Sequence, residues 1–236
     1  MRAIILAGGK GTRLKPYTYS LPKPLMPIGG EMPILEIILK QLKKKGFNHI
    51  TIAVNYMAKI IKAFFDDGSE WGLEIDYSVE STPLNTIGPL TLIENLPDNF
   101  LVMNGDILTD LDYLKFFEWH INNKNDISVA TFKRESIIDF GVLKYNENQE
   151  IFEFIEKPKY YFDVSMGIYA LNKKVIDALP KNEAYGFDQL MIDGIKKKYK
   201  IKGYPHNSYW LDIGRNDDYQ VANEDYIKNK KKFIKL

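Results

Sequence analysis

The first fourteen residues constrain the fold more than any other part of the chain. Residues 3–7 are all apolar, as in a central parallel strand covered on both faces, and the run breaks at once into Gly8, Gly9 and Gly11. A ligand of such a sheet binds beyond the carboxyl end of the strand. Glycines permit turns closed to residues with a Cβ, and they let successive N–H groups point at one anion. The N-terminus therefore predicts a phosphate-binding turn in an α/β protein.

Two cations follow the glycines and suit the same ligand. Arg13, next to Thr12, can hold a phosphate through two parallel hydrogen bonds. Lys23, fixed between Pro22 and Pro24, supplies a point charge. A glycine-rich surface turn with scattered basic residues is the alternative. The strand before the glycines and the enclosed lysine favour the phosphate site.

Two better-known glycine motifs fit less well. A Walker loop ends in Gly-Lys-Ser or Gly-Lys-Thr, whereas here Gly11 separates Lys10 from Thr12. A dinucleotide fingerprint needs a third glycine where this chain has Leu14, so dinucleotide binding remains only as an alternative.

The pattern of apolar residues predicts a Rossmann-like doubly wound α/β sheet with a β-rich second part. No linker interrupts it, so we expect one domain over residues 1–236, with a nucleotide-binding half at 1–110 and an acceptor half at 111–236. We expect helices at 34–42, 59–65, 88–94, 111–123, 173–179, 187–198 and from about 217, and strands at 49–54, 73–79, 100–103, 127–132, 141–145, 151–155, 164–170, 201–204 and 209–211.

Composition is that of one soluble enzyme. The 32 basic residues nearly balance the 31 acidic ones, which gives no general attraction to nucleic acid or to a membrane. The absence of cysteine excludes disulfides, thiolate metal sites and a cysteine nucleophile. The chain starts with a strand rather than a signal peptide, and no apolar run approaches the roughly twenty residues that span a bilayer. We therefore expect a cytoplasmic protein.

Six blocks, in order along nearly the whole chain, resemble the sugar-1-phosphate nucleotidyltransferases. Their Gly-Gly-x-Gly-Thr-Arg-Leu and Pro-Lys-Pro signature is matched by Gly8–Leu14 and Pro22–Pro24. The resemblance implies a mixed sheet of the nucleotide-diphospho-sugar transferase type with a β-rich sugar-binding portion, and transfer of a nucleoside monophosphate from a triphosphate to a sugar 1-phosphate. The other blocks are Gly105-Asp106, Phe140-Gly141-Val142, Glu156-Lys157-Pro158, Met166-Gly167-Ile168-Tyr169 and Trp210-Leu211-Asp212-Ile213-Gly214.

The resemblance also implies roles for single residues. Arg13 and Lys23 would be catalytic, and Asp106 and Asp212 would bind Mg²⁺, a hard cation that prefers carboxylate oxygens. From the residues alone, either aspartate fits a turn or a helix cap equally well. The nucleotide-binding residues would be Leu6, Ala7, Gly8, Gly9, Gly11, Thr12, Glu80, Pro83, Asn85, Thr86, Gly88, Asn104 and Gly105.

For the sugar phosphate, the resemblance implies binding by Gly141, Glu156, Lys157, Gly167 and Trp210. Trp210 fits a core aromatic residue equally well. Spacing alone favours a solvated ion pair at a strand edge for Glu156 and Lys157. The oligomeric state stays open, with a homo-oligomer among the possibilities.

One block departs from the family. Where many members have Pro-Leu-Gly-Thr-Ala-Gly, residues 83–88 read Pro-Leu-Asn-Thr-Ile-Gly. Asn85 tolerates positive φ, so the turn can survive. Ile87 would add bulk beside the base and the ribose.

The base is predicted from Glu80, whose carboxylate can accept hydrogen bonds from the ring N–H and amino groups of guanine. The chain ends soon after the Asp212 block and resembles guanylyltransferases for mannose- or heptose-type phosphates. Thymidylyl, uridylyl or cytidylyl transfer, a choline-like acceptor phosphate, and a non-catalytic nucleotide-sugar sensor remain open.

Overall fold

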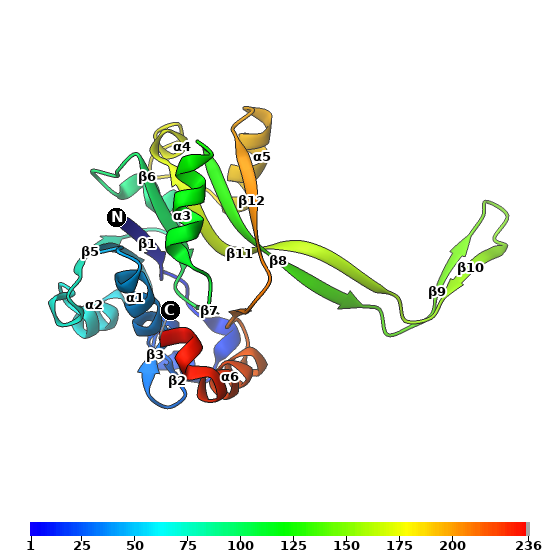
Figure 1. The fold of residues 1–236 in the computed structure, drawn as a ribbon, viewed down its shortest axis with the longest axis horizontal. Helices are drawn as coiled ribbons and strands as arrows, with labels where there is room; N and C mark the ends of the chain where they lie inside the picture. Colours follow the sequence, from blue (N-terminus) through cyan, green and yellow to red (C-terminus); the bar gives the residue numbers. More distant parts are fainter. Residues whose placement is uncertain (235–236) are drawn as a thin grey trace.

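A mixed seven-stranded sheet crosses the molecule in the computed structural model, which describes residues 1–234 (Figure 1). Its strands lie in the order β12-β8-β11-β6-β1-β4-β5. Strand β11 runs antiparallel to both its neighbours, and the other adjacent pairs are parallel. The predicted doubly wound mixed sheet is confirmed. The strands are β1 (Arg2–Leu6), β4 (His49–Val54), β5 (Glu74–Val79), β6 (Asn99–Asn104), β8 (Ile127–Ile137), β11 (Lys159–Asn172) and β12 (Ile201–His206).

Helices cover both faces of this sheet. Ala3 and Ile5 of β1 pack into one apolar cluster, whereas Ile4 packs into the other. A strand buried on both sides has no polar face, which explains the unbroken apolar run at the N-terminus. The first cluster includes α1 (Ile34–Lys44), α2 (Ala58–Phe65), α3 (Tyr113–Asn122) and α6 (Asn216–Ile234), and the second includes the 3-10 helix η5 (Gly88–Leu92), α4 (Lys173–Asp177) and α5 (Phe187–Lys196).

The predicted elements occur at the expected places, with one difference in type and several additional short elements. The segment near 88–94, expected as an ordinary helix, is a single 3-10 helix, η5. The short strand β7 (Ile107–Thr109), which pairs antiparallel with β13 (Trp210–Asp212), was not predicted. Within residues 1–234 no helix combines the length and the apolar character needed to cross a membrane.

Short elements fill the N-terminal connections. Four are 3-10 turns, and β2 and β3 form a small antiparallel pair. They are η1 (Thr12–Leu14), η2 (Tyr17–Tyr19), η3 (Lys23–Leu25), η4 (Ser69–Trp71), β2 (Pro27–Ile28) and β3 (Met32–Pro33).

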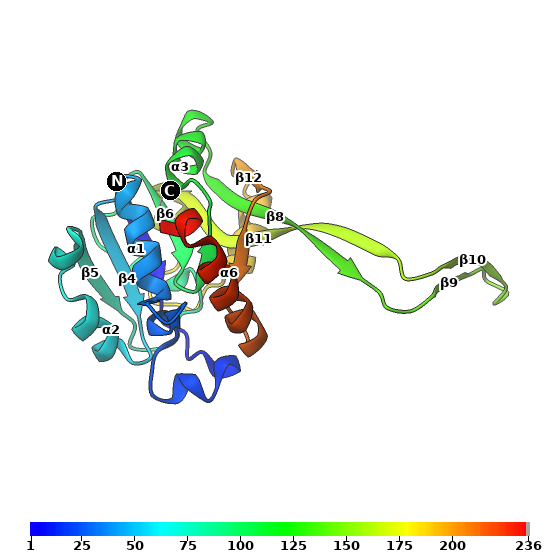
Figure 2. The ribbon, with the colours of Figure 1, turned by 60° about the horizontal axis from the view of Figure 1, so that its bottom comes forward.

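A long β arm, residues 133–163, leaves the body of the molecule. Beyond Phe132, where the pairing with β12 ends, β8 pairs only with β11, from Lys133–Asp163 to Ile137–Lys159. The tip is a separate hairpin of β9 (Val142–Tyr145) and β10 (Ile151–Ile155). Both views show the arm projecting away from the helices (Figures 1 and 2).

The arm corrects one expectation about the second half. We expected the strands after residue 127 to lie beside the nucleotide-binding half. Their inner parts instead join the same sheet, and their outer parts leave it. The strand-forming residues continue past the predicted ends at 132 and 164, so β8 and β11 extend as a two-stranded ribbon.

Candidate active site

The candidate site is a crevice at the carboxyl ends of β1, β4 and β6, the edge at which ligands of open α/β sheets bind. It consists of three adjoining hollows of about 470, 220 and 390 Å³, called here the first, second and third hollow. The first and second share Leu6, Gly9 and Asp106 in their walls. The second and third share Arg13 and Gly214.

The glycine turn after β1 separates the first hollow from the second. Gly11 has φ of +61°, in the left-handed region, and a Cβ there would lie 2.9 Å from the Thr18 methyl group. A Cβ on Gly8 would lie 2.8 Å from a carboxylate oxygen of Glu80. Gly11 is therefore required by the turn, whereas Gly8 leaves room for the Glu80 carboxylate to approach the backbone. The turn leaves its backbone beside Arg13 in the second hollow.

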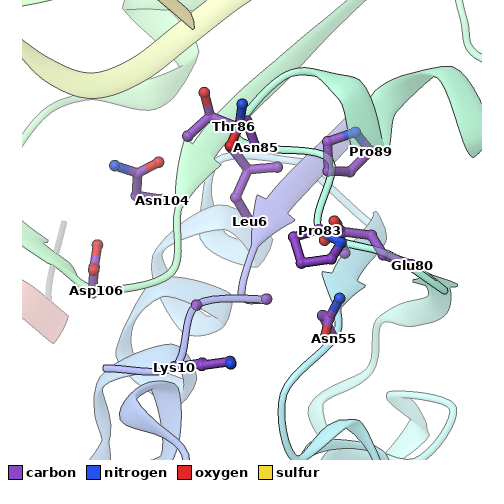
Figure 3. A pocket seen from close by; sticks show the side chains of 13 residues that line it. Leu6, Lys10, Asn55, Glu80, Pro83, Asn85, Thr86, Pro89, Asn104 and Asp106 are labelled. Atoms are coloured by element: carbon purple, nitrogen blue, oxygen red, sulfur yellow. The ribbon is translucent and has the colours of Figure 1, made fainter. Parts of the chain in front are cut away.

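The first hollow is polar at both ends. Figure 3 shows Glu80 and Asn55 on one side and Asn104 with Asp106 on the other. Glu80 accepts a hydrogen bond from the Leu84 N–H over 2.8 Å. Burial raises the pKa of the Glu80 carboxyl, and this hydrogen bond offsets part of the rise. A flat ligand with hydrogen-bond donors on its edge fits between these groups.

In the loop of residues 83–88, which departs from the family pattern, the structure agrees with the expectation for one residue and contradicts it for another. Asn85 has φ of +62° and lines the first hollow, so asparagine does sustain the turn. The expectation for Ile87 was wrong, because this side chain is fully buried in the second apolar cluster and adds no bulk to the hollow. Gly88 is also buried, and its N–H donates to the Tyr185 carbonyl over 3.0 Å. Gly88 therefore packs the loop instead of lining the crevice.

Lys23 and Asp106 meet in the second hollow. The Lys23 ammonium donates to Asp106 Oδ2, and Lys23 is only 9% exposed. Asp106 Oδ1 is buried without a hydrogen-bond partner among the described residues. Because an unpaired buried carboxylate oxygen is costly, this atom is available to a cation or to a ligand donor.

Asp212 lies beside Asp106 because β13 pairs with β7. Asp212 is opposite Ile107, and the Ile213 N–H donates to the Asp106 carbonyl oxygen over 3.1 Å. Partial burial and the nearby charge of Asp106 raise the pKa of Asp212, while Lys23 and Arg13 lower it. The two carboxylates thus repel each other across a gap that a cation would relieve.

The donor set fits Mg²⁺ bound jointly with a phosphate ligand. Within the described part of the chain, no three His, Cys, Asp or Glu side chains form a complete metal site. Mg²⁺ commonly uses one or two carboxylates and completes its coordination with water and substrate phosphates. The unpaired oxygen of Asp106 and the raised pKa of Asp212 agree with such a site.

The third hollow adjoins Asp212 and contains Trp210. The indole Nε1 of Trp210 donates to the Met166 carbonyl over 3.0 Å, and its ring packs 5.6 Å from that of Phe132. Trp210 therefore packs against the sheet and also lines the crevice, while its contact with a sugar stays a prediction. Gly167 has φ of +72°, and a Cβ there would lie 2.6 Å from the Asn104 amide nitrogen. Gly167 thus lets β11 pass close to Asn104.

The remaining sugar-phosphate candidates lie on the arm, outside the three hollows. Glu156 and Lys157 are exposed. Gly141 lies close to both Phe154 and Glu156, so these residues do gather at one place. The long ribbon of β8 and β11 carries that place away from the crevice of the same chain (Figure 2).

The structure therefore brings most of the predicted residues together. The two catalytic candidates, Asp106 and Asp212 and all nucleotide-binding candidates except Gly88 line one of the hollows. The first hollow holds Leu6, Gly8, Gly9, Glu80, Pro83, Asn85, Thr86, Asn104 and Asp106; the second holds Ala7, Gly11, Thr12, Arg13, Lys23 and Gly105; the third holds Trp210 and Asp212.

Sequence reasoning missed five polar residues of the crevice. Lys10 and Asn55 line the first hollow, and Arg134, Arg215 and Asp218 line the third. Asn55 directly follows the buried strand β4, and Arg215 directly follows the Asp212 block, so both residues could have been predicted from the sequence to lie at the crevice. No feature of the sequence indicated Arg134, because its position depends on where β8 leaves the sheet.

Comparison with known proteins gives the family. The model of the nucleotidyl transferase family matches residues 2–229. The chain therefore belongs to this family.

Three relatives illustrate the likeness. Mannose-1-phosphate guanylyltransferase of Mycobacterium tuberculosis is 32% identical over 96% of this chain, and UTP–glucose-1-phosphate uridylyltransferase of Synechocystis sp. is 31% identical over 100% of it. The chain spans 64% and 66% of their lengths, just under two thirds. The crystal structure of HddC from Yersinia pseudotuberculosis complexed with GMP-PN has a TM-score of 0.72 and 28% identity, over 95% of this chain and 99% of that one.

Proposed function

We propose that this member of the nucleotidyl transferase family transfers a nucleoside monophosphate from a triphosphate to a sugar 1-phosphate, with release of pyrophosphate. The observation that carries the proposal is the crevice itself, in which a glycine turn, Arg13, Lys23 and two facing carboxylates adjoin one another. The relatives support the reaction class, since one is named a guanylyltransferase and another a uridylyltransferase.

The reaction requires no protein nucleophile. A phosphate oxygen of the sugar 1-phosphate attacks the α-phosphorus, a new P–O bond forms, and the bond to pyrophosphate breaks. Both substrates are anions, so the main task of the protein is to hold them in line and to reduce their repulsion. Arg13 would bind the departing pyrophosphate, the N–H groups of the glycine turn would hold the triphosphate, and Lys23 would neutralise charge at the reacting phosphates.

Asp106 and Asp212 would hold Mg²⁺ against the nucleotide. When bound, the ion would supply positive charge that offsets the negative charge developing on the phosphates. Lys23 would hold the Asp106 carboxylate in a fixed orientation, since its ammonium donates to Oδ2. The acceptor sugar would occupy the third hollow, beside Trp210 and next to Asp212.

Guanine is the base that we propose. Glu80 lies at the end of the first hollow opposite Asp106, where a carboxylate can accept from the N–H and amino groups of guanine. The guanylyltransferase relative and the GMP-PN complex support this choice, whereas the uridylyltransferase relative keeps uracil as the competing base. A mannose- or heptose-type phosphate is the proposed acceptor, in polysaccharide precursor synthesis. We place the reaction in the cytoplasm, where nucleoside triphosphates are supplied.

Pyrophosphate release tests the proposal directly. The protein would be incubated with Mg²⁺, each of four nucleoside triphosphates, and mannose-, heptose-, glucose- and glucosamine 1-phosphates in turn. We expect GTP with a mannose- or heptose-type phosphate to be the preferred pair. Triphosphate binding without turnover across the whole grid would contradict the reaction and favour a nucleotide-sugar sensor.

A further inference from the structure

The arm exposes apolar side chains that no other part of residues 1–234 covers. Six aromatic rings along it are half or more exposed: Phe140, Tyr145, Phe152, Phe154, Tyr161 and Phe162. A two-stranded ribbon is marginally stable in water unless its apolar face packs against something. Both of its edges also carry unpaired backbone groups, which favour pairing with another chain. Contiguous exposed apolar surface of this kind marks a protein interface.

The continuous β8–β11 ribbon holds the arm away from the crevice of its own chain. The register from Lys133–Asp163 to Ile137–Lys159 is continuous, and the irregularity of β11 lies inside the body, between Ser165 and Tyr169. At about 3.3 Å per residue, the run from Lys133 to Tyr145 reaches up to roughly 40 Å from the sheet. The tip is therefore directed toward another molecule.

The charge of the tip complements the mouth of the crevice. Residues 139–157 contain five acidic residues, including Glu153 and Glu156, and two lysines, Lys144 and Lys157. Arg134 and Arg215 face the third hollow, and neither takes part in an ion pair among the described residues. Opposite charges on two surfaces of the same chain favour a second copy as the partner.

The available area is that of a stable dimer. Six rings that bury about 100 Å² each would contribute roughly 600 Å² per arm and about 1,200 Å² for two exchanged arms. Specific interfaces begin near that total, at about 1,200 Å². Exchange of arms about a two-fold axis also gives a closed dimer, because each copy offers one arm and one crevice.

We infer that two copies of this chain exchange their arms, so that Glu156 and Lys157 of each copy close the acceptor side of the other copy's crevice. Lys157 has φ of +45°, a left-handed conformation that fixes the direction of the backbone at this point. In the partner's third hollow, Lys157 would supply a cation to the acceptor phosphate and Glu156 hydrogen-bond acceptors to the sugar hydroxyls. This role rests on the proposed function, whereas the pairing of the arms does not.

Mass measurement tests the pairing without any substrate. Sedimentation over a concentration series should give a particle of twice the 27.3 kDa of one chain. Phe152→Asp should shift it to the monomer, and Ile195→Asp should not. The two side chains are matched, at 64% and 66% exposed, but Ile195 lies on α5 rather than on the arm. A monomeric wild type, or equal effects of the two substitutions, would overturn the inference.

Mixing two variants tests the shared site. Glu156→Ala/Lys157→Ala lacks the arm groups, and Arg13→Ala lacks a group of the crevice, so each should be nearly inactive alone. After subunit exchange, half of the dimers are mixed and each has one complete site, which should restore about a quarter of wild-type turnover. Turnover no higher than the sum of the separate variants would overturn the shared site. Absence of wild-type turnover would contradict the proposed function, while the mass comparison still decides the pairing.

Discussion

The Lys23 ammonium donates to Asp106 Oδ2, while the other oxygen of that carboxylate, Oδ1, is buried and has no partner in the described part of the chain. One side of Asp106 is thus fixed by the protein and the other is left for a ligand. Asp212 approaches from β13, and its pKa is raised first by burial and then by the nearby charge of Asp106. The arrangement is half of a cation site, and the phosphates of a substrate would provide the rest.

Asp106→Asn should abolish most turnover. The substitution removes the charge that Lys23 holds and the free oxygen assigned to Mg²⁺, so we expect a loss of roughly 10²- to 10³-fold in kcat. Pyrophosphate release measures it. Asp217→Asn on the first turn of α6 is the control and should behave as wild type. Near-normal release from Asp106→Asn would remove this residue from the mechanism.

Lys23→Met should lower kcat more than it raises KM. The ammonium is placed to act on charge that develops during transfer, and the loss of such a group costs about 10²-fold. Steady-state kinetics with the preferred pair of substrates measures the two constants. Lys44→Met, which removes an exposed lysine from α1, should leave both unchanged. A change confined to KM would assign Lys23 to substrate binding alone.

Asp212→Asn should stabilise the metal-free protein at neutral pH. The pKa of Asp212 is raised from 3.8 in the folded state, so the folded protein binds a proton more readily than the unfolded chain. Its favourable contribution is therefore present below pH 3.8 and is lost as the pH rises through the raised value. Urea unfolding should show the variant more stable than wild type at pH 7, with a difference that shrinks toward acid pH.

Mg²⁺ should make the wild type more stable than Asp212→Asn. Added ion should raise the unfolding midpoint of the wild type in the presence of GTP, and much less that of Asp212→Asn, since the ion binds only the folded state. The same urea titration measures it with and without Mg²⁺. An equal rise in both proteins would show that Asp212 is not a ligand.

Gly11→Ala should destabilise the glycine turn, whereas Gly9→Ala should not. Gly11 has positive φ and a Cβ there would approach Thr18, which together cost about 1–2 kcal/mol or more. A Cβ on Gly9 would meet nothing within 4 Å. Denaturant unfolding of the two variants gives the comparison, and equal stabilities would contradict the geometric reason for Gly11.

Glu80→Gln should reduce the preference for guanine. An amide retains one acceptor but places a donor against the base, so we expect the ratio of kcat/KM for GTP to that for UTP to fall by about 10- to 100-fold. Glu94→Gln, which lies outside the crevice, is the control. An unchanged ratio would mean that another group reads the base.

The local part of this protein follows from its sequence. The apolar run before Gly8 specifies a strand buried on both faces, and the positive φ of Gly11 specifies a turn at its carboxyl end. Those features depend on neighbours in the chain, and so do the helices and strands of the first half. The place of Arg13 beside the turn follows for the same reason, because it comes two residues after Gly11. Lys23 comes twelve residues after Gly11, so its place in the same hollow depends on how the intervening segment folds back.

Tertiary structure decided what distant segments do to one another. Asp212 reaches Asp106 only because β13 pairs with the unpredicted strand β7, and Ile87 turns inward because the second apolar cluster receives it. The course of the arm is likewise a property of the sheet, since β8 and β11 keep one register past the point where β12 ends. Spacing along a chain fixes local conformation, but the side of the sheet on which a residue lies depends on pairing and packing between segments far apart in the sequence.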